Sequence, residues 1–204
     1  MRAISLAAAG LVALMAIPAV AQTPPANPPV RVRGTVDKLD GQMLMVKSRD
    51  GSEVTIALAP DYKVAYLVKR TLADIKPGDY VASAGVKAPD GKIYAVEVRI
   101  FPQALRGAGE GQYPWDQGPD SVMTNATVTG TAQATAGEVL TVTYKGKTSD
   151  YIVKPDCPIF GYEAGDASLL KPGAAVFVVA QKKPDGTLTA ARVTAEKDGI
   201  KPPM

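Results

Sequence analysis

The feature that most constrains this chain is an internal repeat, because a stretch near residues 31–101 recurs near residues 126–195. The offset between the copies is 96 positions from Gly34 to Gly130 and 95 positions from Pro77 to Pro172. A duplication of this kind predicts two similar structural units. The motifs that recur in order are Arg33-Gly34-Thr35 as Thr129-Gly130-Thr131, Leu44-Met45-Val46 as Leu140-Thr141-Val142, Ala59-Pro60-Asp61 as Lys154-Pro155-Asp156, Ile75-Lys76-Pro77-Gly78 as Leu170-Lys171-Pro172-Gly173, and Pro89-Asp90-Gly91 as Pro184-Asp185-Gly186.

Within each copy the pattern is that of β-strands. Alternating apolar residues are separated by Asp-Gly turn signals at residues 40–41, 50–51 and 90–91. One short helical turn is expected at Thr71–Ile75, with Thr71 as N-cap and Asp74 completing a capping box. This order is compatible with an OB-type barrel, and a closed barrel leaves no exposed strand edge. The sequence therefore predicts an all-β fold of two tandem small OB-like β-barrels related by the repeat, each with one short helical turn.

The predicted organisation follows the repeat. It consists of a signal peptide at 1–21, a Pro-rich leader at 22–30, a first barrel at 31–101, a Gly/Pro-rich linker at 102–121, a second barrel at 122–195 and a C-terminal tail at 196–204.

The N-terminus has the three parts of a secretory signal. Arg2 supplies the positive charge, residues 3–17 form the apolar stretch, and Ala19-Val20-Ala21 forms the cleavage pattern. The alternative is an uncleaved anchor. No later apolar stretch reaches the roughly 20 residues that a membrane span needs. A periplasmic protein without a transmembrane segment after cleavage is therefore expected.

Composition excludes several kinds of chemistry. The chain has no histidine, which rules out Ser–His and Cys–His nucleophile pairs and zinc sites built on His and Cys. Its single cysteine, Cys157, cannot form an internal disulfide and is expected to be a buried structural thiol. Without Arg2 the basic and acidic residues number 22 and 20, too small a bias for a nucleic-acid partner. No enzymatic activity and no cofactor are expected.

The linker, Pro102–Ser121, contains the best candidate site. Tyr113, Trp115 and Asp116 lie close together there, and Trp115 is the only tryptophan. An aromatic pair in a polar loop can form a platform for a sugar ring or a partner peptide. The alternative is that Trp115 fills the groove between the two barrels and joins them.

Met43 and Met45 form a second, weaker candidate site. They share one strand face, opposite Leu44 and Val46, which match Leu140 and Val142 of the other copy and are expected in the core. Both thioethers should then point outward. Soft ligands of this kind select soft metals such as Cu(I), although outward methionines also pack against neighbouring elements.

The sequence also resembles a known family. The run from Leu72 to Val81, the turn Pro89-Asp90-Gly91, the segment Pro114-Trp115-Asp116 and the run Val122–Thr127 are similar to those of alphaproteobacterial exported proteins of unknown function with small OB-like domains. The second copy departs from the pattern at Ala174, where the first has Asp79. The resemblance implies the same fold and the cell envelope, but no catalytic residue.

These observations predict a periplasmic, non-enzymatic binding or adaptor protein of the cell envelope. Its partner would be an envelope protein or an oligosaccharide, held by the linker and the groove between the barrels. A copper accessory protein that uses Met43 and Met45, and a carbohydrate-binding or carbohydrate-active protein that uses the linker, are the alternatives.

Overall fold

The computed structural model describes residues 28–134 and 137–203, so the predicted signal peptide and residues 22–27 of the leader lie outside the described residues. The described part is nearly all β, which confirms the predicted fold class. Its strands are β1 (Val30–Asp40), β2 (Met43–Ser48), β3 (Glu53–Arg70), β4 (Tyr80–Lys87), β5 (Ile93–Ile100), β6 (Gly111–Pro114), β7 (Ser121–Ala134), β8 (Gly137–Tyr144), β9 (Lys147–Val153), β10 (Ile159–Gly165), β11 (Ala175–Lys182) and β12 (Leu188–Ala195). Three short 3-10 turns accompany them: η1 (Leu72–Asp74), η2 (Gln103–Leu105) and η3 (Ala167–Leu169).

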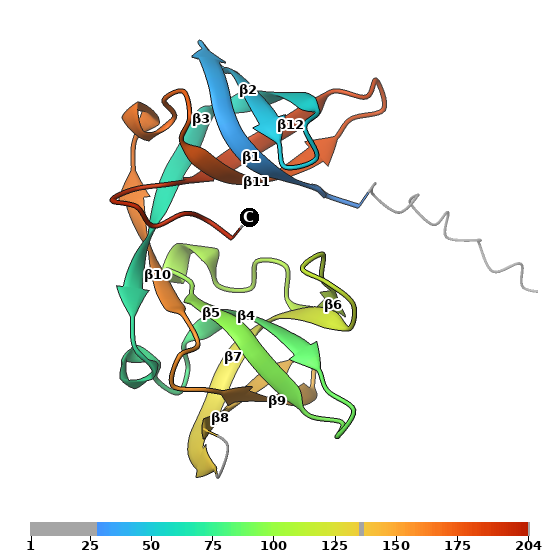
Figure 1. Cartoon of the computed structure of the whole chain (residues 1–204), viewed down its shortest axis with the longest axis vertical. Coiled ribbons are helices and arrows are strands. Elements are labelled where there is room, and N and C mark those ends of the chain that lie inside the picture. Colours follow the sequence, from blue (N-terminus) through green and yellow to red (C-terminus); the bar gives the residue numbers. More distant parts are fainter. Residues whose placement is uncertain (1–27, 135–136, 204) are drawn as a thin grey trace, which may run out of the picture.

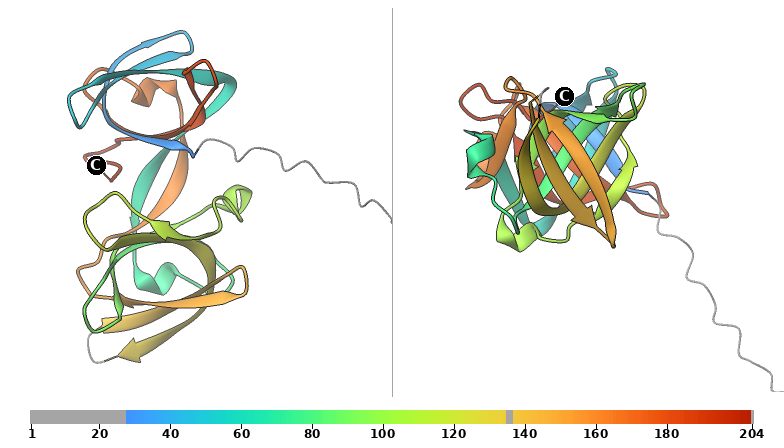
Figure 2. Two further views of the ribbon diagram at one scale, coloured as in Figure 1. Left: turned by 90° about the vertical axis from the view of Figure 1, so that its right-hand side faces the viewer. Right: turned by 90° about the horizontal axis from the view of Figure 1, so that it is seen from below.

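The strands form two closed rings, seen one above the other in Figure 2 (left). In the first barrel the order is β1, β2, β3, β12 and β11, and the pairing of β11 with β1 closes the ring. In the second barrel the order is β7, β8, β9, β5 and β4, and the pairing of β4 with β7 closes it. Each ring has one parallel pairing, β3 with β12 and β9 with β5. Two small OB-type barrels are therefore present, as predicted.

The predicted composition of the barrels is wrong. Residues 31–101 and 122–195 do not each form a barrel, because the two copies exchange their last two strands. The β4–β5 hairpin of the first copy closes the ring of β7, β8 and β9, and the β11–β12 hairpin of the second copy closes the ring of β1, β2 and β3. Alternation of apolar residues indicates which face of a strand is buried. It does not indicate which copy provides the neighbouring strand.

A two-stranded ribbon joins the barrels. The long strand β3 begins in the first barrel, and its end, Val64–Arg70, pairs antiparallel with β10. At its start β10 also pairs with β5 of the second barrel, over Ile159–Gly161. Figure 1 shows β3 and β10 running side by side between the two rings.

Each barrel has its own core, built from both copies. Alternate residues of the strands that form each ring point inward, and each fully buried Val, Leu or Ile contributes about 1.5–3 kcal/mol. The first core includes Val36, Leu44, Val46 and Ile56 from the first copy with Val176, Val178 and Val193 from the second. The second core includes Val81 and Val98 from the first copy with Val128, Leu140, Val142 and Tyr151 from the second.

The helical turns agree with the prediction. η1 has Thr71 as N-cap, whose backbone N–H and hydroxyl both donate to the Asp74 carboxylate, at 2.7 and 2.9 Å. η3 begins after Asp166, which accepts from the Ser168 N–H at 2.8 Å. Among the described residues, none of the helical segments has the length and hydrophobicity of a membrane span.

The structure corrects one of the five repeat matches. A bulge lies between Val36 and Lys38 in β1 and between Val128 and Gly130 in β7, so Val36 is equivalent to Val128, 92 positions on. Arg33-Gly34-Thr35 therefore corresponds to Asn125-Ala126-Thr127 and not to Thr129-Gly130-Thr131. The β7–β8 hairpin is four residues longer than the β1–β2 hairpin. This extra length moved the sequence match out of register.

The two mismatched glycines provide a test of this corrected alignment. A Cβ atom on Gly34 would lie 2.1 Å from the backbone oxygen of Lys47, whereas a Cβ on Gly130 meets nothing within 4 Å. We expect Gly34→Ala to lower the free energy of unfolding by at least about 2 kcal/mol, because backbone must move. Gly130→Ala should change it by less than about 0.5 kcal/mol. Urea unfolding followed by circular dichroism measures both, and equal effects would contradict the alignment.

Candidate functional site

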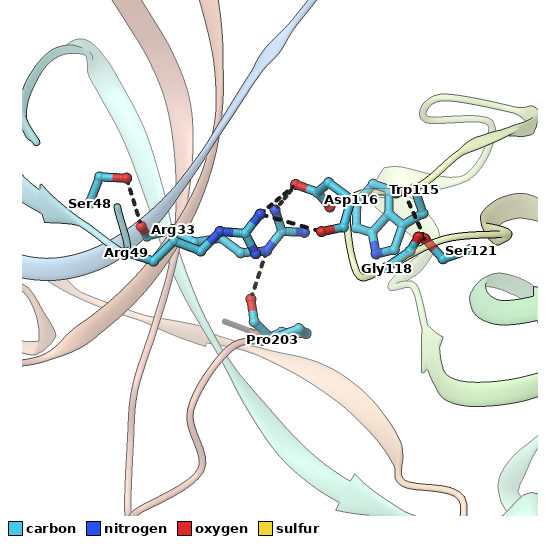
Figure 3. A network of polar contacts seen from close by, with 8 residues as sticks. All are labelled: Arg33, Ser48, Arg49, Trp115, Asp116, Gly118, Ser121 and Pro203. Carbon is cyan, nitrogen blue, oxygen red and sulfur yellow. Dashed lines mark hydrogen bonds and ion pairs between the residues drawn. The ribbon is translucent and has the colours of Figure 1, made fainter. Parts of the chain in front are cut away.

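The segment between the copies is packed against the second barrel. After η2 it forms β6, which pairs antiparallel with the start of β7 and sets Tyr113 opposite Met123. Phe101, Tyr113 and Trp115 cover the small buried side chains of β4 there. The turn that follows is held by Ser121, whose hydroxyl donates to the carbonyl oxygens of Trp115 and Gly118 at 2.8 and 2.7 Å (Figure 3). The linker is thus a structured part of the second barrel.

Trp115 reaches from this segment to the first barrel. The guanidinium carbons of Arg31 and Arg33, both on β1, lie 4.6 and 5.0 Å from the centroid of its ring. Arg31 also lies 5.5 Å from the centroid of Tyr113. Guanidinium groups at these distances are attracted by the electron-rich face of an aromatic ring.

The contacts continue on the other side of Arg33. Its guanidinium carbon lies 4.6 Å from the ring centroid of Phe177 on β11, and that of Arg99 on β5 lies 5.9 Å from the same ring. Trp115 and Phe177 meet edge to face, with centroids 6.5 Å apart. We call this alternating set the arginine–aromatic ladder; it consists of Tyr113, Arg31, Trp115, Arg33, Phe177 and Arg99.

The ladder spans the contact between the barrels. Arg31, Arg33 and Phe177 belong to the first barrel, whereas Arg99 belongs to the second and Tyr113 and Trp115 to the segment packed on it. This is the arrangement expected if Trp115 joins the two barrels. An open aromatic platform for a sugar would instead leave the ring free, and here two arginines lie over it.

Asp116 neutralises the buried charge of Arg33. The Arg33 side chain is only 1% exposed, and its Nη1 donates to Asp116 Oδ2, as Figure 3 shows. Arg33 Nε donates to the carbonyl oxygen of Pro203 in the C-terminal tail at 3.0 Å. Burial lowers the pKa of Arg33, and the neighbouring Asp116 carboxylate opposes that shift. Arg49 approaches the same carboxylate at 3.6 Å.

Not every polar atom of this cluster is paired. Among the described residues, Arg33 Nη2, Trp115 Nε1 and Asp116 Oδ1 are buried without a hydrogen-bond partner. An unpaired buried polar group costs about 1–3 kcal/mol. The cluster is therefore held together by packing and charge as much as by hydrogen bonds.

The far end of the ladder contains a second ion pair. Arg99 pairs with Glu97 and donates from Nη1 to the Tyr162 hydroxyl at 3.1 Å. Burial raises the pKa of Glu97, and the neighbouring Arg99 opposes that shift. Phe101 stacks on Tyr162 with 5.6 Å between centroids.

The structure brings all three predicted linker residues together, and it adds four that sequence reasoning missed. Tyr113, Trp115 and Asp116 all contact arginines of the first barrel. The missed residues are Arg31, Arg33, Arg99 and Phe177. A signal for two of them existed, because Arg31 and Arg33 stand two positions apart and therefore share a strand face.

The methionines lie elsewhere, on β2. Met43 is 40% exposed and Met45 is half-buried, while Leu44 and Val46 are in the core, so the predicted outward direction is confirmed. Met45 lines a small hollow with Asp37 and Glu53. Within the described residues, no three His, Cys, Asp or Glu side chains are grouped so that they could hold a metal ion.

Cys157 is half-buried against the second core. Burial, with smaller contributions from Glu97 and Asp156, raises the pKa of its thiol to about 11. Because the thiolate is the reactive form, this environment favours an inert thiol.

The buried Arg33 charge leads to a mutational prediction. Asp116→Ala should lower the free energy of unfolding by about 2–4 kcal/mol, because it leaves a buried guanidinium without its counter-charge. The matched control is Asp40→Ala, since Asp40 pairs with Lys38 on the surface and should cost less than about 1 kcal/mol. Urea unfolding of both variants measures the difference. Similar values would show that the pairing of Asp116 with buried Arg33 does not stabilise the protein.

Cys157 can be tested by alkylation. A pKa of about 11 leaves roughly a hundredfold less thiolate at pH 8 than a pKa of 9, although the remaining thiolate is more nucleophilic. We expect iodoacetamide to react at least tenfold more slowly with the folded protein than with the protein unfolded in urea. Mass spectrometry of timed samples measures both rates, and equal rates would contradict a protected thiol.

Comparison with known proteins does not assign this chain to a family. No model of a known protein family matches it, and neither the curated proteins nor the solved structures contain a match. The resemblance to exported envelope proteins therefore stays a prediction.

Proposed function

We propose that this protein is an exported, non-enzymatic adaptor of the cell envelope that binds an extended peptide segment of a partner protein. The peptide would add as a strand to the edge of β1 at Val30–Val32. One observation carries the proposal: the equivalent edge of the second barrel is covered by β6, whereas no strand covers this edge among the described residues.

The bulges define the equivalence of the two edges. Since Val36 corresponds to Val128, residues 30–33 of β1 correspond to residues 122–125 of β7. β6 pairs with residues 122–125, on the side of β7 where β8 continues the sheet. On β1, pairing with β2 begins only at Gly34. Residues 30–32 are paired with β11 alone, whereas Arg33 is also bonded to Arg49 on the β2 side.

The backbone of β1 presents hydrogen-bonding groups at this edge. The Arg33 carbonyl accepts from the Arg49 N–H at 2.8 Å, on the β2 side, while the Val36 N–H donates toward the opposite side, to Ala174 at 2.9 Å. Residues two apart in a strand point the same way. The backbone N–H and carbonyl of Arg31 therefore face the β2 side of β1, where the added peptide strand would lie. Strand addition uses groups of this kind for affinity.

The side chains indicate which peptide would fit. In the second barrel, Gln112 of β6 donates to Thr124 and Ser149 at 3.0 and 3.1 Å. Thr124 and Ser149 are equivalent to Val32 and Val54 in the first barrel. A peptide bound there should therefore have an apolar residue at the position that corresponds to Gln112.

The next residue of the peptide would lie opposite Arg31. Tyr113 of β6 lies opposite Met123, the equivalent of Arg31. Beside Arg31 on β11 is Val179, which is 47% exposed. An acidic residue, placed to pair with Arg31, is favoured at this position. The expected ligand is thus an extended peptide with an apolar residue followed by an acidic one.

A designed peptide tests the proposal. The probe has the sequence of residues 109–116 with the changes Gln112→Val and Tyr113→Glu. We expect it to bind the protein, and we expect Arg31→Pro to weaken binding at least tenfold by removing the N–H at the edge. The backbone hydrogen bonds from β1 to β11 are made by the residues on either side of Arg31, so they remain in the Arg31→Pro variant. Fluorescence polarisation of the labelled peptide measures binding.

Two controls separate the edge from the ladder. Arg31→Ala loses the same ladder contacts as Arg31→Pro but keeps the N–H, so it should bind more tightly than Arg31→Pro and no longer prefer Glu over Gln in the peptide. Circular dichroism establishes that both variants are folded. Absence of binding at millimolar peptide, or equal binding by the wild type and the folded Arg31→Pro variant, would overturn the proposal.

A further inference from the structure

We infer that the two sequence copies are the interlocked halves of a pseudo-two-fold dimer fused into one chain, so that the obligate partner of each half is the other half. The basis is the register of the strand pairings, which is independent of the peptide-binding proposal. In a two-fold interface, if residue i of one half contacts residue j of the other, the equivalent of j contacts the equivalent of i. Three sets of pairings in this chain obey that rule.

The ribbon between the barrels is the first set. Leu67 on β3 lies opposite Tyr162 on β10, and these residues are 95 positions apart, the offset of the repeat. On either side of this pair, Tyr66 lies opposite Glu163 and Val68 opposite Gly161. Tyr66 is equivalent to Gly161 and Val68 to Glu163, so the two pairs are the same contact seen from each half. The pseudo-two-fold axis passes between Leu67 and Tyr162.

The exchanged hairpins are the second set. Gly34 pairs with Val176 in the first barrel, and Ala126 pairs with Val81 in the second. Val81 and Val176 are 95 positions apart, and Gly34 and Ala126 are 92 apart, as the bulges require. The two parallel pairings obey the same rule. Leu188 pairs with Ile56 and Ile93 pairs with Tyr151, where Leu188 lies 95 positions after Ile93 and Tyr151 lies 95 positions after Ile56.

The segments that follow the hairpins are the third set. The side-chain amide of Asn125 donates to the carbonyl oxygen of Ala108 at 3.0 Å, and Arg33 Nε donates to the carbonyl oxygen of Pro203 at 3.0 Å. Asn125 is the equivalent of Arg33, and Pro203 lies 95 positions after Ala108. The repeat relation therefore extends beyond the barrels, into the linker and the C-terminal tail.

Because of this exchange, neither copy can form a complete hydrophobic core by itself. The first copy without the second would keep three strands of one ring and two strands of the other, with the apolar faces of β4 and β5 uncovered. Val81 and Val98, on those strands, are fully buried in the barrel whose other strands belong to the second copy. A three-stranded sheet open at both edges does not enclose a core of this size.

The interface has also diverged so that unlike halves fit best. Around the pseudo-axis, Arg33 of the first barrel corresponds to Asn125 of the second, and Phe177 corresponds to Ala82. Large or charged residues of the first barrel therefore stand where the second barrel has smaller, uncharged ones. Two first copies would bring two Arg33 side chains to equivalent positions without the Asp116 of the linker. Like charges placed in this way disfavour that pairing.

Cleavage of the folded chain tests the inference. A protease site is inserted between Gly107 and Ala108, in an exposed loop where Gly107 has a positive φ of 81°. After digestion, we expect the N-terminal fragment, which ends at Gly107, and the fragment 108–204 to elute together at the position of the uncut protein in gel filtration. The melting temperature of the cut protein should rise with protein concentration, whereas that of the uncut insertion variant should not.

Separation of the fragments completes the experiment. After dissociation in urea and removal of the urea, each fragment alone should lack the cooperative melting transition, and a 1:1 mixture should regain it. The inference is overturned if the cut fragments separate at micromolar concentration, or if either fragment alone refolds into a cooperatively melting monomer. Peptide binding is measured on the uncut chain, so failure of one proposal leaves the other standing.

Discussion

The burial of Arg33 between the barrels is the constraint on which the rest of the arrangement depends. A guanidinium removed from water is tolerated only with a counter-charge and aromatic faces around it. Asp116, Trp115 and Phe177 supply these, and they come from the linker and from the exchanged β11. The segment between the copies is therefore held on the second barrel by β6 and on the first by charge. Two rings that could otherwise pivot on the β3–β10 ribbon are held at a second point.

Much of the fold could be predicted from the sequence, because local patterns carry it. Strand alternation identified Leu44 and Val46 as core and Met43 as exposed, and the Thr71–Asp74 capping box marked η1. The repeat indicated two barrels. These features depend on residues a few positions apart, where spacing alone determines which side chains share a face. For Trp115 the sequence left two alternatives open, and the structure sets its ring against Arg31, Arg33 and Phe177 of the first barrel.

The pairing of distant strands could not be predicted. Val81 is predicted to be a core residue whether β4 closes its own ring or the other one. The duplication gives both possible partners a similar apolar pattern, so the pattern does not distinguish them. The four extra residues of the β7–β8 hairpin led to the wrong match of Gly34 with Gly130. Only the strand register shows that the two bulges, and therefore Val36 and Val128, are equivalent. The ladder could not be predicted for a related reason: Phe177 meets Arg33 and Arg99 only once the hairpins have been exchanged.

The exchange of hairpins also decides the order in which the barrels can be completed as the chain emerges from its N-terminus. The second barrel needs β4, β5, β7, β8 and β9, all of which are present once Val153 is available. The first barrel contains β1 but also needs β12, which ends at Ala195. Its three opening strands must wait for the last ones, with their edges unpaired in the meantime. The barrel that begins the sequence is thus the last to close.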